Sequence, residues 1–204
     1  MQTGAILLFT RYPVPGQVKS RLIPALGPQG AAALMHRLTV HTLRQVQNFA
    51  ATQNISLVIY YAGGSTPLMQ NLFGRHFCYR PQVKGDLGQR LLAALQDSLA
   101  AGLRPVVIIG SDCPGLSPAI LTTAFARLQD HDLVLGPAVD GGYYLIGLNA
   151  LHPELFQQIS WGTDQVLTQT MQKAQKLGLL TALLPTLRDI DRPADLCWLS
   201  RLWG

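Results

Sequence analysis

The chain has 204 residues, of which 48% are hydrophobic and 13% charged, which excludes a disordered protein and fits a single domain with a substantial apolar core. No apolar run approaches the roughly 18 residues needed to span a bilayer. Three scattered cysteines without a CxxC pair favour reduced thiols over disulfides or a zinc site, so we expect a cytoplasmic protein.

The net charge of +5 is unevenly distributed along the chain. Residues 1–85 contain eight Lys and Arg and no Asp or Glu, whereas all eleven acidic residues lie in 86–204, so the two parts carry formal charges of +8 and −3. This split favours a protein whose first part contacts a polyanion and whose second part holds a cation through its carboxylates. The alternative is that the basic residues only form a solvated surface. The basic residues are dispersed, and we expect no nucleic-acid partner.

Strand-like apolar runs alternate with helical patterns along the chain. This alternation predicts an α/β fold with a mostly parallel sheet and helices on both faces. The residues between 138 and 143 are too few for a parallel crossover, so one of the two runs beside them is antiparallel and the sheet is mixed. In chain order we expect strands at 5–10, 55–62, 106–110, 133–138, 143–148 and 179–185, and helices from Pro28, after Gly88, from Ser117, after Asp164 and within 189–203, with Pro193 in its first turn.

A basic loop follows the first predicted strand. Arg11, Lys19 and Arg21 lie within eleven residues, two prolines stiffen the loop, and Gly16 permits a tight turn. Ligands of open α/β sheets bind at the carboxyl ends of parallel strands, so these cations favour a nucleotide's phosphates. Lys19 and Arg21 would also offset the charge that develops on a departing diphosphate. The alternative is an ordinary surface loop with exposed basic residues.

Asp112 follows the most apolar run, in the segment Ile109–Pro114. A carboxylate at the end of a strand is a suitable ligand for Mg²⁺ or Mn²⁺, because these hard cations prefer oxygen. The alternative is that Asp112 or Ser111 only organises the turn before the next helix.

Asp140 precedes two glycines that would let the backbone approach a ligand closely. It is a candidate to bind metal, to position a substrate hydroxyl or to act as a base. A tight turn between antiparallel strands explains the same residues equally well, and the sequence leaves both interpretations open.

A late pair of carboxylates, Asp189 and Asp191, follows the last predicted strand. Alternate residues of an extended segment point the same way, so both could face one cation. Asp130 and Asp132 have the same spacing but precede their strand, away from the expected ligand crevice, and we interpret them as a polar connection.

The segment Gly85–Arg90 opens a helix, where free backbone N–H groups favour ribose or phosphate oxygens near Asp86 and Arg90. Asp86 is alternatively only the cap of that helix. Trp161 could stack on a sugar ring, although a core position is the usual role of such a residue.

Taken together, FTRYPVPGQVKSRL, GDLGQRL, IGSDCPGLS, LGPAVDGGYYLIGL and DIDRPADL resemble a bacterial family of glycosyltransferase-A-like proteins, often described as arsenosugar-biosynthesis or radical-SAM/selenodomain-associated transferases. The resemblance runs in order over nearly the whole chain. It implies the Rossmann-like GT-A fold of nucleotide-diphospho-sugar transferases as one domain over residues 1–204. Nucleotidyltransferases of the molybdenum-cofactor and coenzyme F420 pathways share that fold.

The resemblance also implies roles for individual residues. Arg11, Lys19 and Arg21 match the phosphate-binding loop, and Asp112 matches the metal-binding aspartate. Asp140 lies in a segment similar to a DGG segment of guanylyltransferases, and Asp191 matches the aspartate of a late DxDTPEDL-like segment. The sequence departs from the family pattern in two places: SDCP replaces a strict DxD, and Lys84 and Gln89 stand where Gly and Glu are expected.

We therefore expect a glycosyltransferase that uses a nucleoside-diphosphate sugar and Mg²⁺ or Mn²⁺. Asp112 and Asp191 would hold the metal, and Asp140 would orient or deprotonate a small-molecule acceptor. One alternative is a nucleotidyltransferase that joins a nucleoside triphosphate to a phosphorylated small molecule and releases pyrophosphate; another is a non-catalytic nucleotide-binding regulator. A homodimer is left open, and the base, sugar and acceptor are not determined by the sequence.

Overall fold

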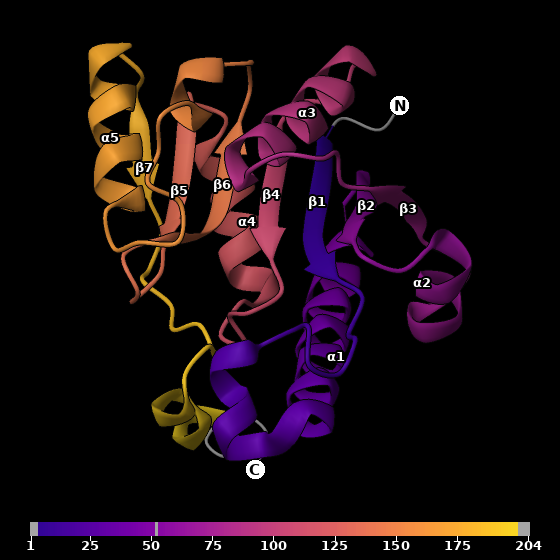
Figure 1. Cartoon of the computed structure of the whole chain (residues 1–204). Helices are drawn as coiled ribbons and strands as arrows, with labels where there is room; N and C mark the ends of the chain where they lie inside the picture. The colour runs from indigo at the N-terminus through magenta and orange to yellow at the C-terminus, as the bar shows by residue number, and fades with distance from the viewer. Residues whose placement is uncertain (1–3, 52, 200–204) are drawn as a thin grey trace.

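Seven strands form one mixed sheet in the computed structural model, which describes residues 4–51 and 53–199 (Figure 1). Strand β6 runs antiparallel to both of its neighbours, β4 and β5, and the other neighbouring pairs are parallel. The predicted mixed, mostly parallel sheet is therefore confirmed. Across the sheet the order is β3 (Cys78–Pro81), β2 (Ile55–Ala62), β1 (Gly4–Arg11), β4 (Val106–Gly110), β6 (Tyr143–Leu148), β5 (Leu133–Pro137) and β7 (Thr181–Leu183).

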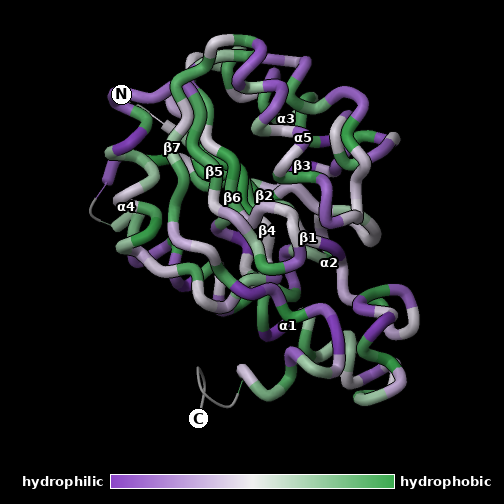
Figure 2. The backbone as a smooth tube through the Cα atoms, turned by 90° about the vertical axis from the view of Figure 1, so that its left-hand side faces the viewer, coloured by the Kyte–Doolittle hydropathy of each residue, from purple (hydrophilic) through white to green (hydrophobic). Residues whose placement is uncertain are grey.

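Helices cover both faces of the sheet because successive side chains of each strand point to opposite sides. In β1, Ile6 and Leu8 pack into one buried cluster and Ala5 and Leu7 into the other. The strands form a hydrophobic band through the middle of the molecule (Figure 2). The first cluster is covered by α1 (Ile23–Ala50), α2 (Thr66–Phe73) and α4 (Pro118–Arg127), and the second by α3 (Leu87–Ala100) and α5 (Val166–Lys176).

Three short 3-10 helices, η1 (Ser20–Leu22), η2 (Pro153–Phe156) and η3 (Pro193–Trp198), complete the described elements. The last predicted helix is thus a 3-10 helix where the structure describes it, and its continuation from residue 200 lies outside the described residues. Helix α1 begins five residues before the predicted start, but Gly27 has a φ of 69° and interrupts it directly before Pro28.

The order of the strands creates a crevice beside β1. The chain proceeds from β1 to β2 on one side, whereas β4 lies on the other, and such a reversal is where open α/β sheets bind ligands. Below these strand ends, η1, the start of α1 and η3 lie together (Figure 1), joined by a buried cluster that contains Leu22, Leu38 and Ile190. None of the described helices is long and apolar enough to cross a membrane.

Candidate active site

The basic loop after β1 is held by a tight turn. The N–H of Gln17 donates to the carbonyl of Val14 over 3.0 Å, and Pro15 and Gly16 occupy the central positions. Gly16 has a φ of 81°, which suits a glycine at the second central position of a type II turn. Lys19 follows with a φ of 48°, a conformation that costs a non-glycine residue about 1–2 kcal/mol. The interactions of Lys19 must therefore offset backbone strain.

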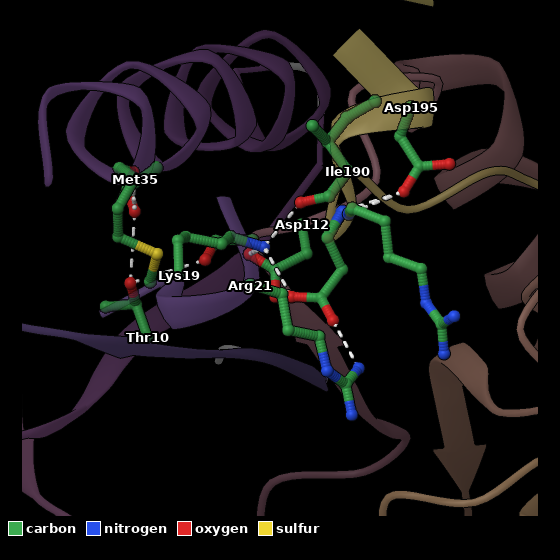
Figure 3. A network of polar contacts seen from close by, with 11 residues as sticks. Thr10, Lys19, Arg21, Met35, Asp112, Ile190 and Asp195 are labelled. Carbon is green, nitrogen blue, oxygen red and sulfur yellow. Dashed lines mark hydrogen bonds and ion pairs between the residues drawn. The ribbon is translucent and has the colours of Figure 1, made fainter. Parts of the chain in front are cut away.

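The ammonium group of Lys19 is buried between the two predicted metal ligands (Figure 3). Its Nζ donates to the carbonyl of Ile190 over 2.7 Å and lies 2.9 Å from Asp112 Oδ1 and 3.8 Å from Asp191 Oδ1. Only 3% of the Lys19 side chain is exposed. The structure thus places a positive charge where both carboxylates converge, and Lys19 binds these acids rather than presenting its charge freely to solvent.

Arg21 makes the second contact to the same acid. Its Nη1 lies 2.6 Å from Asp191 Oδ2, and 57% of its side chain is exposed. Asp191 therefore has one oxygen directed toward Lys19 and the other toward Arg21. Arg21 keeps surface available for a phosphate, whereas Lys19 contributes mainly through the carboxylates.

Asp195 positions this segment, and the sequence analysis did not identify it. Its Oδ2 accepts hydrogen bonds from the backbone N–H groups of Asp191 and Arg192 at 3.2 and 2.7 Å. Arg188 Nη1 lies 3.5 Å from its other oxygen. The sequence does contain a signal for this role, because Asp195 follows Pro193 by two residues. An acidic side chain in the first turn of a helix commonly accepts hydrogen bonds from the backbone N–H groups that precede the helix.

A pocket of about 620 Å³ joins most of the predicted residues at the crevice beside β1. Gly16 does not line it; its part is the turn that presents the loop. The predicted residues that line the pocket are Arg11, Lys19, Arg21, Asp86, Arg90, Asp112 and Asp191, together with the ends of β1 and β4.

Asp86 caps helix α3 and also faces this pocket. Its Oδ1 accepts from the Gln89 N–H at 2.8 Å, and Gln89 Oε1 accepts from the Asp86 N–H at 2.9 Å. Gln89 therefore completes the capping box as a glutamate would. Arg90 Nε donates to the carbonyl of Gly85 over 2.8 Å, which draws this side chain to the pocket's edge.

Asp140 lies apart from the first pocket, in a neighbouring pocket of about 390 Å³. Its Oδ1 accepts from the Gly142 N–H at 2.9 Å, so the turn role left open by the sequence is present. The two pockets share Arg21 and Asp191 as lining residues. Asp140 thus has two roles available, because it closes a turn and faces a pocket adjoining the first.

Asp189 lines this second pocket with Asp140. Burial raises the pKa of the Asp189 carboxyl above its ordinary value, and the neighbouring charge of Asp140 raises it further. On the other side of the chain segment, Ile190 is fully buried and its N–H donates to the Asp112 carbonyl over 2.9 Å. Asp189 and Asp191 both line the second pocket, but only Asp191 contacts Lys19 and Arg21.

Two other interpretations agree with the geometry. Asp132 Oδ2 accepts from the Leu180 N–H at 2.9 Å at the start of β5, so this segment is a polar connection. Trp161 packs against the second core cluster, 6.3 Å from the Tyr143 ring between centroids, and lines neither pocket of the described chain.

The donor set fits a hard cation that arrives with phosphate. Asp112 and Asp191 offer carboxylate oxygens, and 46% and 32% of these side chains are exposed. Within residues 4–51 and 53–199, no group of three or more His, Cys, Asp or Glu could hold a metal ion. Mg²⁺ is commonly bound by one or two carboxylates together with substrate phosphates and water. The residues therefore fit a metal whose remaining ligands come from a nucleotide.

Comparisons with known proteins show which family and which fold this chain resembles. A sequence model of the family described as "Uncharacterized protein conserved in bacteria (DUF2064)" matches residues 42–163. A candidate nucleotide-diphospho-sugar transferase from Desulfovibrio desulfuricans G20 is 33% identical, with a TM-score of 0.88 over 98% of this chain and 87% of that one. The phosphoenolpyruvate guanylyltransferase of Chloroflexus aurantiacus is 26% identical over 170 residues, which cover 82% of this chain and 80% of the relative.

A more distant structure shares the fold alone. The glucosyl-3-phosphoglycerate synthase of Mycobacterium tuberculosis, in complex with Mn²⁺, UDP and phosphoglyceric acid, is 13% identical, with a TM-score of 0.59 over 99% of this chain and 79% of that one. The nucleotide-diphospho-sugar transferase fold that the sequence motifs imply is confirmed.

Proposed function

We propose that this chain, which belongs to the DUF2064 family, is a divalent-metal-dependent transferase that takes a glycosyl group from a nucleoside-diphosphate sugar. One observation carries the proposal: Asp112 and Asp191 converge on a buried ammonium beside a pocket large enough for a nucleotide. Such a pair of acids, approached by Arg21, suits the metal and diphosphate of a nucleotide sugar. The predicted cytoplasmic location and the use of Mg²⁺ or Mn²⁺ belong to the same proposal.

The loop residues bind and neutralise the diphosphate. Arg11 and Arg21 are exposed at the pocket and would donate to phosphate oxygens. Lys19 lies between Asp112 and Asp191 and offsets part of the charge of both carboxylates. A divalent ion bound by these carboxylates would supply charge stabilisation to the departing diphosphate.

The second pocket would hold the sugar and the acceptor hydroxyl. In the transfer, a bond forms from the acceptor oxygen to the anomeric carbon while the bond from that carbon to the diphosphate oxygen breaks. The hydroxyl proton passes to a carboxylate, for which Asp140 is the candidate because it lines this pocket on a rigid turn. The nucleoside diphosphate leaves with the bonding electrons.

Nucleotidyl transfer is the second candidate, and two observations favour it. The guanylyltransferase relative matches most of this chain. In addition, Arg188 and Arg192 line the second pocket, where they would suit a phosphorylated acceptor. In that reaction the acceptor's phosphate oxygen attacks the α-phosphorus of a nucleoside triphosphate, and pyrophosphate leaves.

Turnover of the purified chain with Mn²⁺ or Mg²⁺ separates these reactions. The assay presents panels of nucleotide sugars and triphosphates with hydroxylated and phosphorylated acceptors, and measures free nucleoside diphosphate and pyrophosphate. We expect nucleoside diphosphate from a nucleotide sugar. Pyrophosphate released only with a phosphorylated acceptor would contradict glycosyl transfer and support the second candidate. Metal-dependent binding without any turnover would indicate the non-catalytic regulator.

A further inference from the structure

The end of the first pocket that lies away from Asp112 contains an amide with a fixed orientation, that of Gln82. Its Nε2 donates to the carbonyls of Thr10 and Tyr60 at 3.2 and 3.0 Å. Two carbonyl oxygens can be faced only by the NH₂ group, so the amide cannot be flipped. Both amide hydrogens are used, and Oε1 is therefore the atom that Gln82 offers to a ligand. Within residues 4–51 and 53–199, this oxygen has no hydrogen-bond partner.

A second acceptor lies four residues along the chain. Asp86 uses Oδ1 to cap α3, and in the described chain Oδ2 has no hydrogen-bond partner. The capping box restrains the Asp86 side chain, because Gln89 bonds both its carboxylate and its backbone N–H. Both Gln82 and Asp86 line the pocket. This end of the pocket therefore presents two restrained oxygens that accept hydrogen bonds and do not donate them.

The position of the phosphates decides which part of a nucleotide meets these oxygens. In the proposed function the phosphates lie at Asp112, Asp191 and Lys19, and Gln82 and residues 85–87 also line the pocket. Across the sheet the pocket passes from the end of β4, over the end of β1, to the segment that follows β3. A nucleotide with its diphosphate at Asp112 would extend its base toward Gln82 and Asp86.

We infer that this pocket selects guanine, with Gln82 Oε1 and Asp86 Oδ2 accepting hydrogen bonds from the N1–H and N2–H₂ groups of the base. Guanine presents these donors side by side. Uracil places its one N–H between two carbonyls, and adenine and cytosine place an acceptor beside their amino group. Each of these bases would therefore place one of its own acceptors against Gln82 Oε1 or Asp86 Oδ2. The inference rests on the proposed function, since it requires a nucleotide in this pocket.

Calorimetric titration of the whole chain with GDP, IDP, UDP, CDP and ADP in Mn²⁺ tests the inference. We expect GDP to bind at least about tenfold more tightly than UDP, CDP or ADP, because those bases cannot donate to both Gln82 Oε1 and Asp86 Oδ2 and lose at least one hydrogen bond. IDP lacks the N2 amino group and is expected to bind about tenfold more weakly than GDP. Equal affinities, or tighter binding of UDP, would overturn the guanine assignment while leaving the proposed function intact. No binding of any diphosphate would overturn both.

The variant Asp86→Asn separates base selection from folding. Asparagine keeps an oxygen for the Gln89 N–H and replaces the second acceptor by a donor. We expect this variant to lose the preference for GDP over UDP while its helix content and Tm stay near those of the wild type. Asp97→Asn, on the same helix but outside the pocket, is the matched control and should keep the preference. A preference that persists in Asp86→Asn would refute the role of Asp86.

Discussion

Replacing Lys19 by methionine removes the ammonium and keeps much of the buried aliphatic chain. Breaking a fully buried ion pair costs about 3–5 kcal/mol, because it leaves an uncompensated charge. Here the cost is smaller, since 46% of Asp112 and 32% of Asp191 are exposed and water can solvate these charges. The lost hydrogen bond to the Ile190 carbonyl adds about 1 kcal/mol. We expect a net loss of about 2 kcal/mol in the free energy of unfolding.

Urea denaturation at pH 7 measures this loss, and added Mn²⁺ tests its origin. Without the ammonium, Asp112 and Asp191 repel each other and should accept a divalent cation in its place. A ligand of the folded state at about 100 times its Kd stabilises by about 2.7 kcal/mol, enough to restore the variant. The wild type without nucleotide should respond much less, because Lys19 occupies the space between the acids.

The matched control is Lys84→Met, which removes an exposed lysine that does not line the pocket. It should match the wild type to within about 0.5 kcal/mol, with and without Mn²⁺. If Lys19→Met were as stable as this control and indifferent to Mn²⁺, the reasoning about the buried ammonium would be refuted.

Two further predictions concern packing and thiol reactivity. Gly88→Ala should lower the free energy of unfolding by about 1–3 kcal/mol, because its Cβ would overlap the carbonyl oxygen of Phe156; Gly110→Ala, with nothing within 4 Å of its Cβ, should not. Equal urea midpoints for the two variants would contradict this packing. Burial, with the nearby charge of Asp112, raises the pKa of the Cys113 thiol. That thiol stays protonated at pH 8, so Ellman's reagent should titrate the two exposed cysteines in the native protein and Cys113 only in denaturant. Rapid reaction of all three thiols in the native protein would contradict the burial of Cys113.

The strands were predictable where the side chains are mostly apolar. β2, β4 and β6 have the predicted bounds because each is a largely apolar run between turn residues, with Ser56 of β2 as its one polar side chain. Helix α2 and strand β3 were not predicted. α2 has eight residues, of which only Met69 and Phe73 are buried, and β3 is a four-residue edge strand with three exposed positions. Such short elements carry too little hydrophobic periodicity to identify, and tertiary contacts decide their structure.

The candidate site was predictable as a set of positions but not as a set of contacts. Arg11 ends β1 and Asp112 follows β4, and the carboxyl ends of these neighbouring parallel strands meet at one edge. The partners of Lys19 depend on how residues 189–195 return to the crevice, and this depends on the packing of Ile190 against α1 and η1. No local pattern encodes that long-range contact. The sequence therefore predicted that Lys19 contacts phosphate, whereas in the structure Lys19 is paired with Asp112 and Asp191.

Equilibrium dialysis of GDP and UDP against the protein, with Mn²⁺ or with EDTA, tests most directly whether this crevice is a metal-dependent nucleotide site. We predict that the wild type binds at least one diphosphate with Mn²⁺ and loses most of that affinity in EDTA. Asp112→Ala should show only the weak, metal-independent binding. Affinity that is unchanged by EDTA and by Asp112→Ala would contradict the account.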